Sequence, residues 1–590
     1  MEEKKEFLDK ILDFIFSKDN KKYVLLFFVI GLILRIISAI SYQPNADEMV
    51  YGVRAIGFIK SGLILEMHQS PLWYFLTDLF HIFFGVSLLT SRILSVILGS
   101  LAVILVYMIA KELFNERIAL LSSFLVMISP YLIRTTIAEM DIPMIFFIML
   151  SFYLFLLFFK TENKKYIYVS AIIFGLASLI KTISLSFLPA FALIFLWKKY
   201  NKKEKLFTQD NIILGLKFFL IILVIYSPLL FSNYLLYQDK HITDTYFFRF
   251  FDIAPGTYEG ISSTLKPFSL HDVFFSYENH KPGFYEGLKF VYEWDILIFI
   301  LFILGLIISF IKNRNITIIL LLLILPTFIF LSGTSLLPNH FSFLIPFLAV
   351  FSAIFIDFAS RKIPKINPLI FLLMALVLIS VFSLYTLRKD GALNSTHELQ
   401  KIREDIKNAD DNSLVIIDSR FYRGRVAWMA NDKHYVEGLL VSDLAQKAEE
   451  INKNKASIKT YFVECIRDDC GWGYTQKEVN DSMEGLVNIF SQSKNVKTIY
   501  DNRNNKPYAN IYESTLELSP VILQLADLNE NFFYYSVGYK NKEQILTSYS
   551  VYNFSGKMLN LLSYLIFYLS IILSILSIPL FLYLFFREKE

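Results

Sequence analysis

The sequence lacks the features that mark several common classes of protein. Its formal net charge is only +4, and its basic residues are scattered between apolar runs instead of forming one patch, which argues against binding to nucleic acid. It contains no glycine-rich loop that could hold phosphate groups, no Ser-His-Asp motif order and no internal repeat. Evidence for a function must therefore come from other residues.

Cysteine is scarce as well. The only two cysteines, Cys465 and Cys470, are separated by four residues. A zinc site needs more ligands than this stretch offers. If the segment lies outside the cytosol, a disulfide that closes a small loop is the natural interpretation.

Hydrophobic and aromatic residues are abundant instead. They make up 55% and 16% of the chain, with 58 Phe and 34 Tyr, which exceeds what a soluble core of this size uses. The charged residues 1–22 precede no small-residue cleavage site, so we interpret the first apolar run as a retained anchor. The sequence predicts about twelve membrane spans, at residues 23–40, 91–110, 118–134, 142–159, 166–180, 183–197, 211–235, 292–311, 315–333, 341–358, 366–386 and 558–586.

Short basic loops set the predicted topology. With a cytoplasmic N-terminus they all fall inside, at residues 111–117, 160–165, 198–205, 312–314, 361–365 and 587–590. The long segment 388–557 then lies outside, and its strand-like runs (414–417, 459–463, 496–500, 509–512) and helix-like run (442–452) predict a small α/β domain. We expect an α-helical polytopic membrane protein with a cytoplasmic N-terminus (1–22), a transmembrane domain (23–387), an extracytoplasmic α/β domain (388–557), and a last transmembrane helix with a cytoplasmic tail (558–590).

Two adjacent carboxylates, Asp47 and Glu48, follow the first span and so lie at a membrane surface. Acidic residues there usually mark a site or a solvated loop. Apolar residues at helical spacing over 47–59 predict an amphipathic helix in the membrane interface, with Asp47, Tyr51 and Arg54 on one face. The alternative interpretation is that Asp47 only caps this helix.

A second interfacial helix is predicted to begin at Pro71, because proline suits the first helical turn. The loop that enters it contains His68 and Gln69. These two side chains join the candidates on the outer side of the membrane.

A second acidic pair, Glu139 and Asp141, lies at another outer helix end. Carboxylates at this spacing can bind one divalent cation, Mg²⁺ or Mn²⁺, and no other cofactor is predicted. Negative charge is also favourable at a helix N-terminus, so the alternative for Asp141 is a capping role.

Cationic side chains gather at the same level of the predicted bundle. Each could simply extend to lipid headgroups, but together they predict an anion site at the outer span ends; they are Arg92, Arg134, Lys181 and His340. An enzyme that takes a sugar from a lipid phosphate needs such a site, because the departing phosphate is a weak base and requires charge stabilisation. The acceptor must lose a proton, and a carboxylate such as Asp47 can take it.

These motifs resemble those of the integral-membrane type C glycosyltransferases, particularly the protein O-mannosyltransferase and aminoarabinose-transferase branches. Asp47-Glu48 followed by Tyr51, and His68 followed by Pro71-Leu72, are similar to the two outer-loop motifs of that family. Further similarities lie at residues 91–94, 139–143 and 175–181, and the resemblance covers roughly residues 21–390.

The chain also departs from both branches. Gln69-Ser70 stands where the mannosyltransferases have consecutive prolines and the aminoarabinose enzymes have a Glu-Lys pair whose lysine helps to hold the lipid phosphate. Val50 stands where the aminoarabinose branch has arginine. The resemblance therefore implies that Lys181, Arg92 and His340 are the phosphate partners here.

The sequence thus predicts an inverting membrane glycosyltransferase that moves a monosaccharide from a polyprenyl (dolichyl-type) phosphate to a protein, lipid or glycan acceptor on the outer face. The alternatives are a multi-pass transporter or lipid flippase, which would favour ionisable residues and broken helices near the midplane, and a catalytically inactive relative that binds glycan. The expected catalytic residues are Asp47 and Glu48, and the expected substrate-binding residues are Tyr51, Arg54, His68, Gln69, Arg92, Lys181 and His340.

The predicted topology can be tested through the two cysteines. After mild reduction, a membrane-impermeant thiol reagent should label Cys465 and Cys470 in right-side-out vesicles, because the segment 388–557 is expected outside. Labelling that occurs only in inverted vesicles would contradict the topology.

Overall fold

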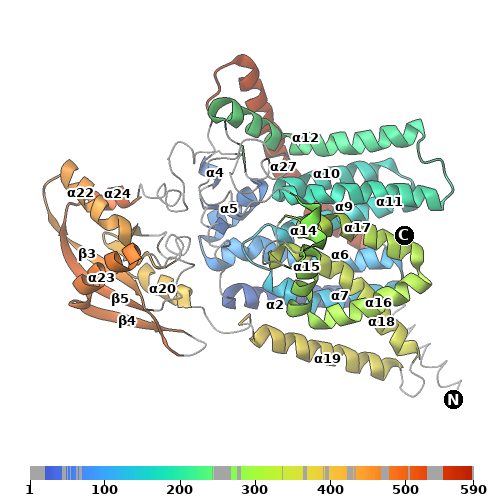
Figure 1. Cartoon of the computed structure of the whole chain (residues 1–590), viewed down its shortest axis with the longest axis horizontal. Helices are drawn as coiled ribbons and strands as arrows, with labels where there is room; N and C mark the ends of the chain where they lie inside the picture. Colours follow the sequence, from blue (N-terminus) through green and yellow to red (C-terminus); the bar gives the residue numbers. More distant parts are fainter. Residues whose placement is uncertain are drawn as a thin grey trace.

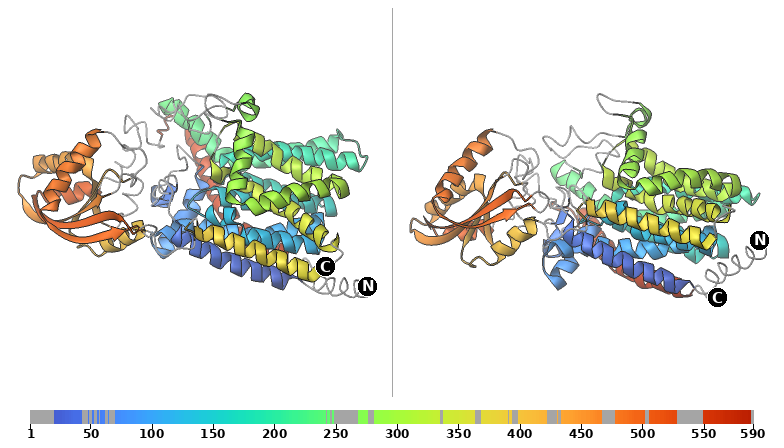
Figure 2. Two further views of the ribbon diagram at one scale, coloured as in Figure 1. Left: turned by 60° about the horizontal axis from the view of Figure 1, so that its bottom comes forward. Right: turned by 90° about the horizontal axis from the view of Figure 1, so that it is seen from below.

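The computed structural model of the chain describes residues 20–42, 48, 51–52, 55–56, 58–61, 64, 70–241, 243–244, 247, 268–275, 281–334, 337–362, 368–389, 391–392, 398–421, 430, 433–466, 477–501, 505–527 and 549–587. A large helical bundle carries a smaller sheet domain at one end (Figure 1). Two further views keep the sheet domain at that same end (Figure 2). The predicted fold class, a helical membrane bundle with a C-terminal α/β domain, is confirmed.

Nine helices in the described part of the chain are long and apolar enough to cross a membrane. Short 3₁₀ turns, η1 (Thr182–Phe187) and η2 (Pro338–Leu344), open two of them. The nine are α2 (Lys21–Ser41), α6 (Leu88–Leu113), α9 (Asp141–Thr161), α11 (Leu188–Asn201), α12 (Gln209–Lys240), α17 (Arg314–Ser332), α18 (Ile345–Lys362), α19 (Pro368–Lys389) and α27 (Phe554–Arg587).

The other three predicted spans form shorter or broken helices. Residues 118–134 are divided between α7 (Glu116–Ile128) and α8 (Pro130–Arg134), and α10 (Lys164–Ile180) has 17 residues. The predicted span 292–311 is divided between the end of α15 (Gly283–Trp294) and most of α16 (Ile296–Lys312). These two helices meet at an angle of 118°. Hence the described helices give nine or ten candidate spans where the sequence predicted about twelve.

A buried arginine compensates the break between α7 and α8. Because Pro130 has no N–H, it cannot donate the helical hydrogen bond that the carbonyl of Val126 would accept. The fully buried guanidinium of Arg35, on α2, donates instead to the Val126 oxygen at 3.1 Å and to the Met127 oxygen at 3.4 Å. Backbone carbonyls thus satisfy a charge inside the first span.

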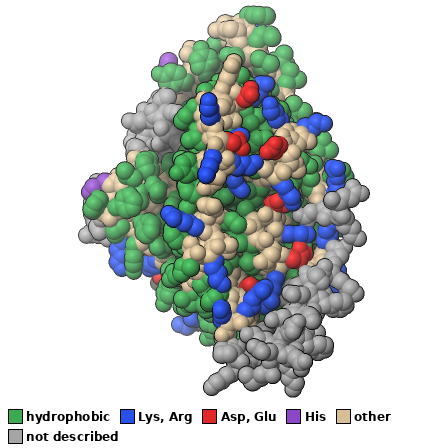
Figure 3. Space-filling view, turned by 90° about the vertical axis from the view of Figure 1, so that its right-hand side faces the viewer, with side chains coloured by type: hydrophobic (Ala, Val, Ile, Leu, Met, Phe, Trp, Pro, Cys, Tyr) green, Lys and Arg blue, Asp and Glu red, His purple; other side chains and the backbone are tan. Residues whose placement is uncertain are grey.

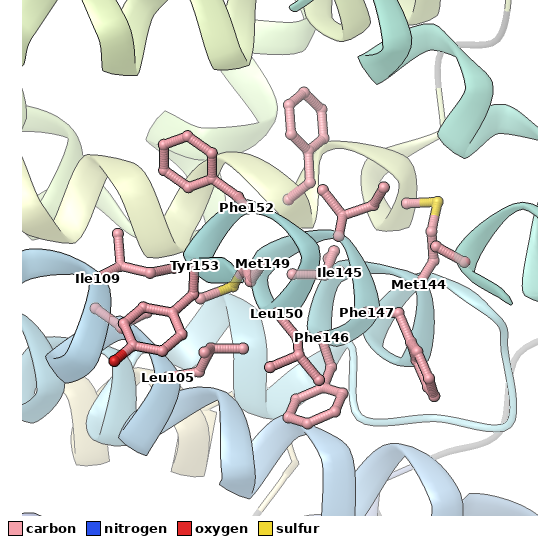
Figure 4. Packing of buried hydrophobic residues seen from close by; sticks show 14 of the residues in the cluster. Leu105, Ile109, Met144, Ile145, Phe146, Phe147, Met149, Leu150, Phe152 and Tyr153 are labelled. Carbon is pink, nitrogen blue, oxygen red and sulfur yellow. The ribbon is translucent and has the colours of Figure 1, made fainter. Parts of the chain in front are cut away.

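The core of the bundle surrounds α9, whose apolar side chains project in all directions (Figure 4). Phe146 packs edge-to-face on Phe147, with 5.6 Å between the ring centroids, and Leu105 and Ile109 of α6 lie beside Tyr153. A helix that is apolar on every side must be covered on every side. α9 is therefore a central helix of the bundle, and its N-terminal end is held in place by the helices around it.

Two short helices lie between the bundle and the sheet domain: α4 (Phe58–Ser61) and α5 (Leu72–Phe84). At 13 residues, α5 is too short to span a bilayer, and it coincides with the second predicted interfacial helix. Its last residues, Ile82, Phe83 and Phe84, are exposed apolar side chains of the kind that a membrane interface would cover. Nearly half of the first predicted interfacial helix, over 47–59, lies outside the described residues, and α4 includes its last two residues.

The sheet domain has five described strands in the order β2-β1-β3-β5-β4. β1 (Leu414–Ile417) pairs in parallel with β2 (His434–Glu437) and β3 (Ala456–Cys465), whereas β5 (Pro507–Leu518) is antiparallel to β3 and β4 (Lys494–Tyr500). In this register Val415 lies opposite both Tyr435 and Tyr461. The accompanying helices are α20 (Glu398–Lys407), α22 (Val441–Ile451), α23 (Lys477–Ser491) and α24 (Val521–Asp527), with the turn η3 (Gly438–Leu440); α14 (Leu270–Phe274) belongs to the bundle.

All four predicted strands and the predicted helix over 442–452 are present, while β2 is an additional strand. Cys465 ends β3 and is disulfide-bonded, as predicted. Its predicted partner, Cys470, lies outside the described residues.

The sheet domain contacts the bundle at the turn between α5 and α6. Leu88, the first residue of α6, is buried in the same apolar cluster as Leu399 and Ile402 of α20. Arg403 donates a hydrogen bond from Nη2 to the Val86 carbonyl at 2.8 Å. The end of the bundle that includes the start of α6 therefore faces the sheet domain.

The opposite end of the bundle carries many lysine and arginine side chains among apolar ones (Figure 3). This is the end near which both chain termini lie in Figure 1. Basic side chains at this end agree with the predicted cytoplasmic side.

Close packing of α16 on α18 generates a stability prediction. A Cβ atom at Gly305 would lie 1.8 Å from the Phe351 carbonyl oxygen, so the helices can approach this closely only without a side chain there. Gly305→Ala should lower the free energy of unfolding in detergent by about 1–3 kcal/mol. Gly215→Ala is the matched control, since nothing lies within 4 Å of a Cβ on that membrane helix. Equal stability of the two variants would contradict the packing.

Candidate active site

The structure describes seven of the predicted site residues and brings them to the end of the bundle that faces the sheet domain. They are Glu48, Tyr51, Arg92, Glu139, Asp141, Lys181 and His340. Four others, Asp47, Arg54, His68 and Gln69, lie outside the described residues.

Glu48 and Arg92 form a buried ion pair. Both nitrogens Nε and Nη2 of Arg92 donate to the Glu48 carboxylate, the latter at 2.7 Å, and the two side chains are at most 1% exposed. Nη1 of Arg92 donates to the carbonyls of Ala39 at 2.7 Å and Tyr42 at 2.9 Å, which end α2. Oε1 of Glu48 also accepts from the Ala138 N–H at 2.8 Å. The pair thereby ties together α2, α6, residue 48 and the turn before α9.

These contacts favour a positioning role for Arg92. The guanidinium directs four hydrogen bonds to protein atoms, so little of it is left for a phosphate. Arg92 is held there because α6 begins at a fixed point: Ser87 and Thr90 exchange side-chain-to-backbone hydrogen bonds at its N-terminus.

Lys181 and Asp141 form a second buried pair. Nζ of Lys181 lies 2.8 Å from each carboxylate oxygen of Asp141, and both side chains are 3% exposed. Lys181 follows the last residue of α10, and Asp141 is the first residue of α9. The carboxylate therefore sits at a helix N-terminus, where negative charge is favourable, but it binds lysine instead of capping the helix.

The 3₁₀ turn η2 completes this cluster. Asn339 donates from Nδ2 to both carboxylate oxygens of Glu139, at 3.1 and 2.9 Å. Its neighbour His340 is close enough to interact electrostatically with Asp141. The turn is anchored by Tyr131, whose hydroxyl donates to the Pro338 carbonyl.

Ser70, which was not among the predicted site residues, connects the start of α5 to the turn after α10. The Ser70 hydroxyl accepts from the Thr182 N–H at 3.0 Å and lies 2.8 Å from the Thr182 hydroxyl, which in turn lies 3.2 Å from the Tyr226 hydroxyl of α12. Thr182 is the residue after Lys181, so the start of α5 is tied to the Lys181–Asp141 pair. Only one feature of the sequence could have indicated these additional polar residues: each lies beside a predicted site residue. They are Ser70, Thr182 and Asn339.

Metal binding is not favoured by the described residues. Among them, no three His, Cys, Asp or Glu side chains lie together as metal ligands. Lys181 takes both carboxylate oxygens of Asp141, and Asn339 takes both of Glu139. The two carboxylates predicted to hold Mg²⁺ or Mn²⁺ are thus already compensated by protein donors.

Part of the chain matches a known protein family, and the fold matches solved structures. Residues 68–231, which include Ser70, Arg92, Asp141 and Lys181, match the family model of the dolichyl-phosphate-mannose-protein mannosyltransferases. Two crystal structures of ArnT from Cupriavidus metallidurans share the fold at 12% identity. The apo structure matches with a TM-score of 0.54 over 84% of this chain and 98% of that chain. The structure bound to undecaprenyl phosphate matches with a TM-score of 0.53, over 83% and 98%.

The family-model match over residues 68–231 and the fold likeness to ArnT support the resemblance to the integral-membrane type C glycosyltransferases that the motifs predicted. An uncharacterised protein of Aquifex aeolicus is 27% identical over 164 residues, which cover 26% of this chain and 32% of that protein. The chain thus matches about a third of the length of this relative.

The Glu48–Arg92 pair generates a prediction about stability. Arg92→Met leaves a buried carboxylate without its cation and should lower the free energy of unfolding by about 3–5 kcal/mol. The double variant Glu48→Gln/Arg92→Met should lose less than the sum of the two single losses, because the unpaired charge is removed. Lys202→Met, in the exposed pair with Glu162, is the control and should change stability by less than about 1 kcal/mol. Additive losses in the double variant would contradict a direct pair.

Proposed function

We propose that the protein transfers a monosaccharide from a polyprenyl phosphate to a protein, lipid or glycan acceptor on the extracytoplasmic side of the membrane. The observation that carries this proposal is the cluster of the buried Lys181–Asp141 pair and the half-buried His340, which supplies cationic groups at the bundle end facing the sheet domain. It lies within the segment that matches the mannosyltransferase model, apart from His340. The fold likeness to ArnT, whose structure holds undecaprenyl phosphate, supports a donor of the same chemistry.

The proposed reaction needs a base, an electrophile and a stabilised leaving group. An acceptor hydroxyl attacks the anomeric carbon, the carbon–oxygen bond to the lipid phosphate breaks, and the bonding electron pair leaves with the phosphate. Asp47 takes the proton of the attacking hydroxyl. Attack from the face opposite the phosphate inverts the configuration at the anomeric carbon.

Lys181 is the proposed partner of the leaving phosphate. Its ammonium group carries three donors, and the pair with Asp141 keeps it charged in a dry environment. Fixed positive charge in such a place stabilises charge that develops on the departing oxygen. His340 adds to this charge when it is protonated, and Asn339 keeps Glu139 compensated so that the cluster does not repel the phosphate.

Glu48 and Arg92 are proposed to position the site. Glu48 is the neighbour of Asp47 in the sequence, and its carboxylate is wholly engaged with Arg92 and the Ala138 N–H. It therefore cannot also serve as the base. Tyr51, Arg54, His68 and Gln69 remain proposed contacts of the substrate.

The distribution of basic residues supports the proposed side of the membrane. The end of the bundle opposite the site carries the basic surface of Figure 3, which supports cytoplasmic termini and an extracytoplasmic site. On this side the sheet domain can meet an acceptor.

Measuring the turnover of variants at the two acidic residues, Asp47 and Glu48, tests the proposal. Purified protein in liposomes is supplied with polyprenyl phosphates that carry radiolabelled mannose or 4-amino-4-deoxyarabinose, and sugar transfer is measured. Asp47→Asn should lower turnover about 10²- to 10⁴-fold at unchanged melting temperature, because it removes proton uptake but keeps shape. Glu48→Gln should lower the melting temperature, since it breaks the buried pair.

Asp210→Asn, at an exposed position in the first turn of α12, is the control and should retain turnover. Activity of Asp47→Asn within a few-fold of the unmodified protein would refute the assignment of the base. Absence of transfer from every lipid donor by the unmodified protein would refute the proposed function itself.

A further inference from the structure

Two polar side chains on α5 are completely buried without a hydrogen-bond partner. The indole Nε1 of Trp73 and the hydroxyl Oγ1 of Thr77 have none, and both residues are 0% exposed. A buried polar group left without a partner costs about 1–3 kcal/mol. Nearly all such groups in folded proteins are satisfied by protein, water or a ligand, so two on one helix need an explanation.

The two groups share one face of α5, because residues four apart on a helix lie one above the other. Trp73 is also packed by the adjacent Tyr74, with 5.2 Å between the ring centroids, and Tyr74 stacks on Phe58 of α4 at 5.0 Å. Aromatic rings therefore pack beside Trp73 at the start of α5.

This face lies close to the proposed donor phosphate partner. Ser70, one turn before Trp73, hydrogen bonds to Thr182, which follows Lys181 in the chain. α5 also packs against α10, the helix that ends just before Lys181. A helix rises 1.5 Å per residue, so Trp73 and Thr77 lie roughly 5 and 10 Å along α5 from that anchor.

We propose that Trp73 and Thr77 bind the sugar of the lipid donor, an inference that rests on the proposed function. A polyprenyl chain offers no hydrogen-bonding atoms, and the phosphate has its partner in Lys181. The sugar, attached to that phosphate, presents hydroxyl groups that can accept from the indole N–H and exchange hydrogen bonds with the threonine hydroxyl. Trp73 also offers an apolar ring to the C–H face of a sugar. Trp73 and Thr77 would thus bind the sugar, whereas Lys181 would bind the phosphate.

The test separates stability from binding. Trp73→Phe removes the N–H and Thr77→Val removes the hydroxyl, and both keep the approximate shape of the side chain. If the groups serve only a ligand, each variant should be as stable as the unmodified protein or more stable, because an unsatisfied polar group has been removed. Each should nevertheless bind mannosyl or aminoarabinosyl polyprenyl phosphate about 2- to 10-fold more weakly, the value of one hydrogen bond.

Bare undecaprenyl phosphate is the second probe. Trp73→Phe and Thr77→Val should bind it as tightly as the unmodified protein does, whereas Lys181→Ala should lose affinity for both the bare and the glycosylated lipid. Trp197→Phe is the matched control, since its indole Nε1 is likewise buried without a partner but lies on α11, near the basic end of the bundle. It should change neither binding reaction.

Four results would overturn the inference. Unchanged affinity for both glycosylated lipids would show that the two groups are simply unsatisfied. Equal weakening for bare and glycosylated lipid would assign α5 to the phosphate or the chain. A raised KM for the acceptor alone, with unchanged donor affinity, would assign the face to the acceptor. Failure of the unmodified protein to bind any polyprenyl phosphate would overturn the proposed function and, with it, this inference.

Discussion

The ion pair between Glu48 and Arg92 is the contact on which the arrangement of the site depends. Charges inside a membrane bundle are costly unless each is paired and hydrogen-bonded. Here one carboxylate and one guanidinium form hydrogen bonds with each other. The guanidinium also donates to the carbonyls that end α2, and the carboxylate also accepts from the N–H of Ala138 before α9. Three segments that are far apart in the sequence are therefore held at one end of the bundle by a single pair of charges.

The same physical rule extends from this pair to its neighbours. Beyond Ala138 the chain continues to Glu139 and Asp141, and each carboxylate there has a donor from another helix end: Asn339 of η2 and Lys181 after α10. Ser70 adds the start of α5 through Thr182. Charge compensation among helix ends thus holds the side chains of the candidate site in fixed positions.

The sheet domain is joined to this network through the first residues of α6. Leu88 belongs to the core of the sheet domain, and Arg92 lies one turn further along the same helix. The start of α6 therefore connects the sheet domain directly to the Glu48–Arg92 pair.

The sequence by itself determined the membrane class, most of the spans, the α/β domain and the level at which charged residues gather, because apolar run length and basic-loop placement are local signals. It also placed Glu48, Arg92, Asp141 and Lys181 among the candidates. Only the tertiary structure decided which charged residues pair. Arg92 binds Glu48 and not Asp141, and Lys181 binds the Asp141 carboxylate that was predicted to hold a metal. The structure also decided that α7 ends where Arg35 can donate to the carbonyls left without a helical partner. Partners 40 or more residues apart are chosen by how helices pack, and no local pattern encodes that geometry.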